Sequence, residues 1–204
     1  MNVAINGFGR IGRSVFRILN SQKKINVVAI NDIADNEAMA YLLKYDTVMG
    51  PFKDSVEIDG DILKTSFNNI KMLAEREPSQ LPWGEMGVDV VIESTGIFRT
   101  KKQLDGHIKA GAKRVILTVP AKDEIDYTLV IGVNDNGLTD DHKIISNASC
   151  TTNCLAPMAK ILNDSFGIEH GVINTIHAYT NDQRLADVPH SDWRRSRAAA
   201  ENII

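Results

Sequence analysis

The sequence has few cysteines, no long apolar run and no strong excess of either charge. Its two cysteines, Cys150 and Cys154, are four positions apart among 204 residues. On a helix they would lie one turn apart, which is poor geometry for a structural disulfide. We therefore expect reduced thiols in a cytoplasmic protein.

These absences exclude several classes of protein. No apolar run approaches the roughly 18 residues of a membrane span. The segment that opens with Asn2 has neither the basic flank nor the cleavable apolar stretch of a secretory leader. The net charge is only −3, so we expect neither a nucleic acid nor a membrane surface as partner. No metal site is predicted. An apolar content of 43% is typical of a globular protein.

A glycine-rich motif stands near the start of the chain. A short apolar strand leads into Gly7, Gly9 and Gly12, and a helical pattern and a second strand, residues 25–30, then end at Asp32. This order is typical of a dinucleotide-binding unit, in which the first glycine allows a tight turn, the second lets the backbone approach a pyrophosphate, and the third lets helix and strand pack closely. A carboxylate at Asp32 accepts ribose hydroxyls and repels a 2′-phosphate, which predicts NAD rather than NADP. The alternative is a glycine turn without a ligand.

Strand and helix patterns continue to alternate beyond this unit. Short strand-like pieces lie between residues 55 and 73, with a hairpin turn at Gly60-Asp61. Further elements are expected as helices at 36–45 and 101–110 and as strands at 88–92, 114–118, 129–132 and 143–146. The pattern predicts an α/β fold of the Rossmann type, with a doubly wound, mostly parallel sheet wrapped by helices.

Three small residues fall at the carboxyl ends of predicted strands. They are Thr95, Gly96 and Thr118. Ligands of such sheets bind beyond the carboxyl ends of the strands. Each residue alone could equally be ordinary turn chemistry, but their shared edge favours a ligand contact.

The segment 147–154 places a thiol where strand-like sequence gives way to helix-like sequence. Apolar residues recur at helical spacing after it, and Ser, Thr and Asn crowd the turn before it. Cys150 is therefore predicted in or near the first turn of a helix, where the helix dipole favours a thiolate and lowers a thiol pKa. Such a thiolate suits covalent catalysis on a carbonyl. The alternative is a small, buried and inert cysteine.

The last part of the chain is less regular. A strand is expected at 171–180, with His177 near its end, and a polar, basic stretch follows at 181–199. The run Arg194–Arg197 within that stretch could be a solvated surface.

Four segments together closely resemble the glyceraldehyde-3-phosphate dehydrogenase family. They are Asn6–Arg13, Ala148–Cys154, His177–Asp182 and Arg194–Ala200. The likeness extends over the whole chain. The cysteine and histidine segments are the specific ones, because the glycine motif occurs in many families.

The resemblance implies a glycolytic oxidoreductase that uses NAD. Cys150 would attack the aldehyde of glyceraldehyde 3-phosphate and His177 would act as base. Inorganic phosphate would then release the acyl group as 1,3-bisphosphoglycerate. The resemblance also implies a homotetramer.

The resemblance assigns further roles residue by residue. Cofactor contacts are implied at Arg10, Ile11, Asp32, Arg76 and Thr118. Ser149 and Thr151 match the phosphate-ion site, and Thr180 and Arg195 match substrate-binding residues, with Arg195 chosen over Arg194 and Arg197. Pro189 matches a position that carries proline in NAD-preferring members. Cys154 is expected to be a buried neighbour that could trap an oxidised Cys150.

The same resemblance implies that the second domain is incomplete. We expect an NAD-binding domain at 1–149 that lacks its closing helix, and the first part of an α+β catalytic domain at 150–204. Apolar surface on the helix after Cys150 should then be exposed, and the 204-residue chain should have little or no activity. Two alternatives remain open: an erythrose-4-phosphate dehydrogenase, and a catalytically dead NAD-binding module.

Overall fold

The computed structural model describes residues 1–202. Within this range the chain forms two compact units, residues 1–165 and 166–202. Ile203 and Ile204, where the predicted interruption of the second domain falls, lie outside the described residues. No helix in the described range is long and apolar enough to span a membrane.

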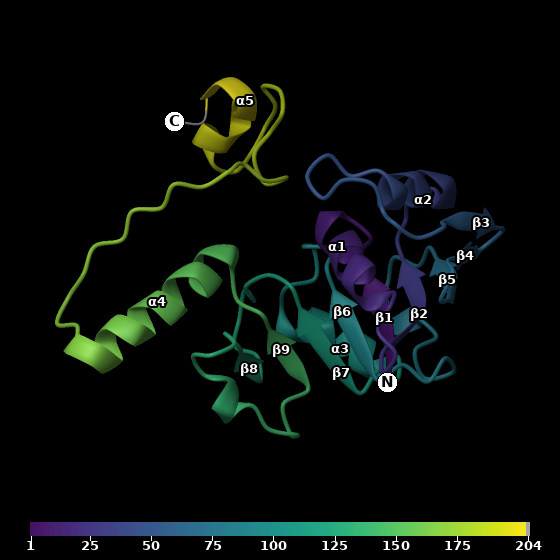
Figure 1. The fold of residues 1–204 in the computed structure, drawn as a ribbon, viewed down its shortest axis with the longest axis horizontal. Coiled ribbons are helices and arrows are strands. Elements are labelled where there is room, and N and C mark those ends of the chain that lie inside the picture. The colour runs from purple at the N-terminus through teal and green to yellow at the C-terminus, as the bar shows by residue number, and fades with distance from the viewer. Residues whose placement is uncertain (203–204) are drawn as a thin grey trace. The chain divides into compact units, whose positions relative to one another are not determined.

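The first unit is built on one nine-stranded sheet (Figure 1). Its strand order is β3-β4-β5-β2-β1-β6-β7-β9-β8. All neighbours pair in parallel except β3 with β4 and β4 with β5. The strands are β1 (Asn2–Asn6), β2 (Asn26–Asn31), β3 (Glu57–Asp59), β4 (Ile62–Lys64), β5 (Asn69–Leu73), β6 (Val90–Glu93), β7 (Arg114–Leu117), β8 (Tyr127–Thr128) and β9 (Ile144–Ser146).

Helices cover both faces of this sheet, as a doubly wound fold requires. They are α1 (Arg10–Leu19), α2 (Asn36–Lys44) and α3 (Lys101–Lys109), with 3-10 turns η1 (Pro78–Gln80) and η2 (Asp135–Gly137). Helix α4 (Cys150–Phe166) follows β9 and has no buried residue. Successive β1 residues point to opposite faces: Ile5 packs with Phe16 of α1 and Leu43 of α2, whereas Ala4 packs with Trp83. The predicted α/β class and Rossmann-type sheet are confirmed.

Strand β1 lies where the direction of winding reverses. The chain proceeds from β1 to β2 and β5 on one side, then returns to β6 on the other side of β1. Ligands of open α/β sheets bind beyond the strand ends at such a switch point. The carboxyl ends of β1, β2 and β6 should therefore frame the ligand site.

The predicted hairpin at Gly60-Asp61 is confirmed, since β3 and β4 pair in antiparallel fashion on either side of it. The predicted strand at 129–132 is wrong. The strand there is β8, two residues earlier, and only the Leu129 N–H extends the ladder, by donating to the Ser146 carbonyl. The chain then turns, because the Asn134 side chain accepts the Val130 N–H at 2.8 Å and Gly132 has a φ of +80°.

The second unit contains little regular structure. Its elements are the 3-10 turn η3 (Trp193–Ser196) and the short helix α5 (Ala199–Asn202). The predicted strand at 171–180 is wrong: these residues form no strand and are all exposed. An isolated extended segment is not stable as a strand without a neighbour to pair with, and within the described residues no segment pairs with this one.

Candidate functional site

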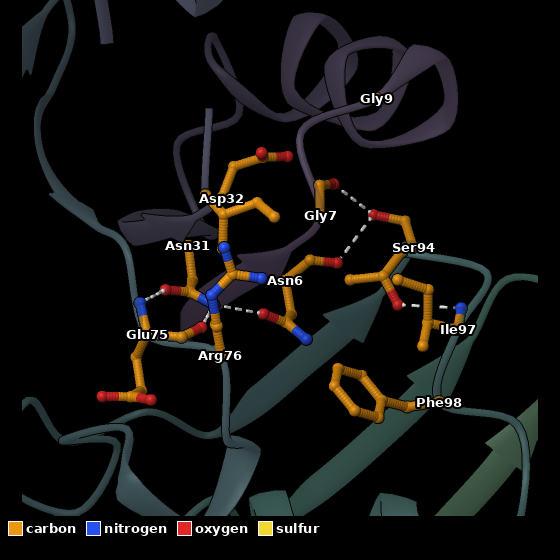
Figure 2. A pocket seen from close by; sticks show the side chains of 12 residues that line it. Asn6, Gly7, Gly9, Asn31, Asp32, Glu75, Arg76, Ser94, Ile97 and Phe98 are labelled. Atoms are coloured by element: carbon orange, nitrogen blue, oxygen red, sulfur yellow. Dashed lines mark hydrogen bonds between the residues drawn. The ribbon is translucent and has the colours of Figure 1, made fainter. Parts of the chain in front are cut away.

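A pocket of about 390 Å³ opens at the predicted edge of the sheet (Figure 2). It is framed by residues at or just beyond the carboxyl ends of β1, β2, β5 and β6. Its lining residues are Asn6, Gly7, Gly9, Asn31, Asp32, Ile33, Glu75, Arg76, Ser94, Thr95, Ile97 and Phe98.

The three predicted glycines differ in what surrounds them. Gly7 has a φ of +89°, and a Cβ there would lie 2.5 Å from the backbone nitrogen of Thr95. A Cβ at Gly12 would lie 2.1 Å from the carbonyl oxygen of Gly7. A Cβ at Gly9 would meet no atom within 4 Å. Gly7 and Gly12 thus allow the turn and the helix to pack, whereas Gly9 leaves open space beside the backbone.

The first turn of α1 is suited to an anion. Its N-cap is Gly9, which has no side chain to bond the first amide groups, and no acidic residue lies in the first turn. Unsatisfied N–H groups and the helix dipole favour a negatively charged ligand there. A dinucleotide pyrophosphate fits this end of the helix.

Asp32 has a second role in the structure. It lines the pocket from the end of β2, and its Oδ2 accepts the N–H of Phe8 in the glycine turn at 2.7 Å. Its Oδ1 accepts the N–H of Ala34 at 3.0 Å. The carboxylate therefore fixes the glycine turn relative to β2, and its remaining acceptor positions suit a ribose diol.

The pocket gathers five of the ten predicted cofactor residues: Gly7, Gly9, Asp32, Arg76 and Thr95. The other five lie outside its lining: Arg10, Ile11, Gly12, Gly96 and Thr118. Among these, Ile11 is 50% exposed at the start of α1. The Thr118 hydroxyl donates to the carbonyl of Glu93 at 3.1 Å, so it sits at the end of the adjacent strand β7.

Arg10 pairs with Asp46 in the structure. Its two terminal nitrogens lie 3.0 and 3.3 Å from the carboxylate oxygens of Asp46. Asp46 also accepts the N–H groups of Met49 and Val48. These backbone bonds first, and then Arg10, lower the pKa of Asp46 from 3.8 to about 2.

This shift predicts an acid-sensitive contact beside α1. Because the folded pKa lies below the unfolded one, the stabilisation is present above pH 3.8 and is lost as the pH falls towards 2. Asp46→Asn keeps an oxygen for the two amide groups but removes the titration. We expect its urea midpoint to fall less between pH 5 and pH 2 than that of the wild type. Equal falls in the two proteins would contradict this assignment.

Several pocket residues were not predicted. They are Asn6, Asn31, Ile33, Glu75, Ser94, Ile97 and Phe98. Figure 2 shows Asn31 bonded to Asn6 and to Glu75, and Ser94 bonded to the glycine turn. The sequence did offer one indication of three of them. Asn6, Asn31 and Ser94 stand at or just after predicted strand ends, as Thr95 does.

The predicted position of Cys150 is confirmed, since it is the first residue of α4. The turn before it is unusual: Ala148 has a φ of +55°, a conformation that is uncommon outside glycine. Ser149 then caps the helix by accepting the Thr152 N–H at 3.0 Å. The turn directs the start of α4 away from β9 and exposes Cys150.

The other residues of this helix are also accessible. Cys154 was expected to be buried, but it is exposed, as Cys150 is, and Thr151 is half-buried. No residue of α4 is fully buried. Its apolar residues Met158, Ile161 and Leu162 are 52%, 66% and 52% exposed, as the predicted apolar surface requires.

The remaining predicted residues lie in the second unit. His177 is exposed, and its Nδ1 lies 2.6 Å from the carbonyl oxygen of Ala178, which can only accept. A neutral ring then has its lone pair on Nε2, as a base requires. The amide and hydroxyl of Thr180 both donate to Gln183. Arg195 pairs with Asp182 and lies 3.6 Å from Asp192.

Comparison with known families matches both parts of the chain. Residues 1–101 match the family described as glyceraldehyde 3-phosphate dehydrogenase, NAD binding domain. Residues 149–204 match the C-terminal domain of the same family.

Individual relatives agree with these matches. Glyceraldehyde-3-phosphate dehydrogenases of Borreliella burgdorferi and Streptomyces coelicolor are 56% and 55% identical, over 100% of this chain and 62% and 61% of their own lengths. That of Thermotoga maritima is 55% identical over 99% of this chain and 61% of its own. The chain thus spans about three fifths of the length of the curated relatives it matches.

Proposed function

Since this chain belongs to the glyceraldehyde-3-phosphate dehydrogenase family, we propose that it serves the NAD-dependent oxidation of glyceraldehyde 3-phosphate with inorganic phosphate. The predicted cofactor, NAD, agrees with the NAD binding domain matched at residues 1–101. The product would be 1,3-bisphosphoglycerate, formed through a thioester on Cys150.

One observation carries this proposal more than any other. The chain combines a glycine-turn pocket at the switch point with an exposed thiol at the start of a helix, both within the first unit. The pocket suits a dinucleotide, and the helix start favours a thiolate. An oxidation that passes through a covalent acyl-enzyme needs both.

The proposed sequence of steps uses residues of this chain. The Cys150 sulfur adds to the aldehyde carbon, and His177 removes the hydroxyl proton through Nε2. NAD held in the pocket by the glycine turn and Asp32 would supply the hydride acceptor, and loss of the hydride would leave the acyl group on the Cys150 sulfur as a thioester. A phosphate oxygen then attacks the acyl carbon, and the sulfur leaves as the thiolate. Ser149, Thr151, Thr180 and Arg195 would hold the two anionic groups.

The domain division and the assembly belong to the same proposal. We place the boundary between residues 149 and 150, which is supported by the start of the second family match at 149. The partners would be glyceraldehyde 3-phosphate, phosphate and further copies of the chain in a homotetramer, in the cytoplasm.

The experiment that tests the activity follows NADH formation by absorbance. Because the chain spans about three fifths of the length of its relatives, we expect a signal weaker than theirs, and one that requires NAD+, glyceraldehyde 3-phosphate and phosphate together. A signal with erythrose 4-phosphate that does not need phosphate would favour the related dehydrogenase instead. NAD+ binding without turnover of either aldehyde would leave a binding module and refute the proposed activity.

Asp32 provides a test of cofactor choice. Asp32→Ala removes the predicted partner of the ribose diol and the charge that repels a 2′-phosphate. We expect NAD+ affinity to fall at least about tenfold and NADP+ affinity to rise relative to it, because each lost charged hydrogen bond contributes about 1.5–3 kcal/mol. Titration calorimetry with both nucleotides measures the two constants. An unchanged ratio of NAD+ to NADP+ affinity would refute the role of this carboxylate.

A further inference from the structure

A network of buried, hydrogen-bonded polar side chains lies next to the nucleotide pocket. It links Trp83, His107, Glu93, Asn6 and Asn31, whose exposed fractions are 0%, 0%, 0%, 1% and 5%. The Trp83 indole N–H donates to His107 Nδ1 at 3.0 Å, and His107 Nε2 lies 3.0 Å from Glu93 Oε2. The Asn6 amide donates to the same oxygen at 2.6 Å. Such a network lies outside the steps proposed above.

The groups at the two ends of this network fix the direction of the hydrogen bonds between them. An indole nitrogen can only donate, so His107 Nδ1 must hold a lone pair. The ring is therefore neutral, with its proton on Nε2, and donates to Glu93. The His107 ring therefore gives Glu93 a hydrogen bond but no positive charge.

The other end is anchored by backbone groups. Asn31 accepts the Glu75 N–H at 2.8 Å and donates to the Glu75 carbonyl at 2.8 Å, which sets the orientation of its amide. Its nitrogen donates to Asn6 Oδ1 at 2.7 Å, so the Asn6 nitrogen must face Glu93. Figure 2 shows Asn31 hydrogen-bonded to Asn6 and to Glu75 among the residues that line the pocket.

The second oxygen of Glu93 contacts Thr95. Its Oε1 accepts the Thr95 N–H at 2.8 Å and the Thr95 hydroxyl. Three of the groups around the carboxyl cannot reverse their roles: the Asn6 amide nitrogen, the His107 Nε2–H and the Thr95 N–H all donate. The Thr95 hydroxyl can either donate or accept. The Glu93 carboxyl group is completely buried, and each of its oxygens accepts at least one hydrogen bond whose direction is fixed.

We propose that Glu93 is a positioning residue of the nucleotide pocket, which holds Asn6 and Thr95 in place through this carboxylate while the neutral His107 ring holds the carboxylate. Asn6 and Thr95 line the pocket, and Glu93 does not. The Glu93 carbonyl also accepts the Thr118 hydroxyl, so two predicted cofactor residues depend on the same strand end. The ligand-binding part of the inference rests on the proposed NAD site, whereas the proton arrangement does not.

The proton arrangement is tested on the unmodified chain by nitrogen-15 NMR of the His107 ring. We expect a protonated Nε2 and an unprotonated Nδ1 that is coupled to the indole proton of Trp83. We also expect slow hydrogen exchange at the Thr95 amide, because a buried carboxylate accepts it. A charged ring, or a proton on Nδ1, would overturn the proposal.

The positioning role is tested with Glu93→Gln and a matched control. Glutamine turns one acceptor into a donor, so either the Thr95 N–H loses its acceptor or the Asn6 and His107 donors lose theirs. We expect the dissociation constant for NAD+ to rise about tenfold, as for the loss of one or two hydrogen bonds. Leu104→Ala is the control, since Leu104 is buried one turn before His107 in α3 but packs against β7 and β9.

The possible outcomes distinguish the positioning role of Glu93 from the proposed function. If the dissociation constant for NAD+ rises more in Glu93→Gln than in Leu104→Ala, the positioning role of Glu93 is supported. If the two variants lose equal stability and their dissociation constants rise equally, the positioning role is overturned. If the wild type binds no NAD+, the proposed function fails, and the proposal about Glu93 is then judged by the ring and the Thr95 amide. If Glu93→Gln does not fold, those two measurements on the wild type decide.

Discussion

Gly7→Ala is expected to destabilise the first unit by more than about 3 kcal/mol. Residue 7 has a φ of +89°, which is costly for alanine, and its Cβ would lie within 2.8 Å of three backbone atoms of Ser94 and Thr95. Neither backbone can move alone, because the Ser94 N–H donates to the Asn6 carbonyl and the Thr95 N–H to Glu93. Urea unfolding followed by circular dichroism measures the loss.

Gly9→Ala is the matched control two residues away. Its φ is −70°, an ordinary value for alanine, and its Cβ would meet nothing within 4 Å. We expect a change in stability within about 0.5 kcal/mol, as at surface positions. The added methyl group would nonetheless occupy the space beside the helix start, so NAD+ affinity should fall at least about tenfold. A stable Gly7→Ala variant, or an unstable Gly9→Ala variant, would contradict this division of roles.

The two glycines also illustrate how much the sequence could predict. The spacing of Gly7, Gly9 and Gly12 between two strands predicted the turn, the helix and the site, because close backbone packing has few solutions. Alternating strand and helix patterns likewise predicted the sheet. The order of the strands could be known only from the structure. The same holds for the pocket residues Asn6 and Asn31, which belong to no recognised motif and become neighbours only in the folded chain.

The failures of prediction have a common physical cause. The apolar residues at 129–132 and 171–180 resemble strands, but a strand depends on a partner and not on its own residues alone. At 130–134 the Asn134 side chain satisfies the backbone by forming a turn. Ala148 could not be predicted either, because its φ of +55° is imposed by the connection between β9 and α4.

Cys150→Ser is expected to lower aldehyde-dependent NADH formation at least about a thousandfold, since a hydroxyl at the same position is a far weaker nucleophile than a thiolate. Cys154→Ser should change it less than about threefold. The chain supplies this control itself: both cysteines are exposed and both lie on α4, but only Cys150 begins the helix. The dipole of the helix acts mainly within its first turn.

Alkylation with iodoacetamide tests the same difference without any turnover. In the Cys154→Ser variant, Cys150 should react at least about tenfold faster at neutral pH than Cys154 does in the Cys150→Ser variant, because the thiolate is the reacting form. The advantage of Cys150 should disappear at high pH, where both thiols are ionised. Similar rates at neutral pH would mean that the helix start does not favour the thiolate, and the proposed covalent step would lose its physical basis.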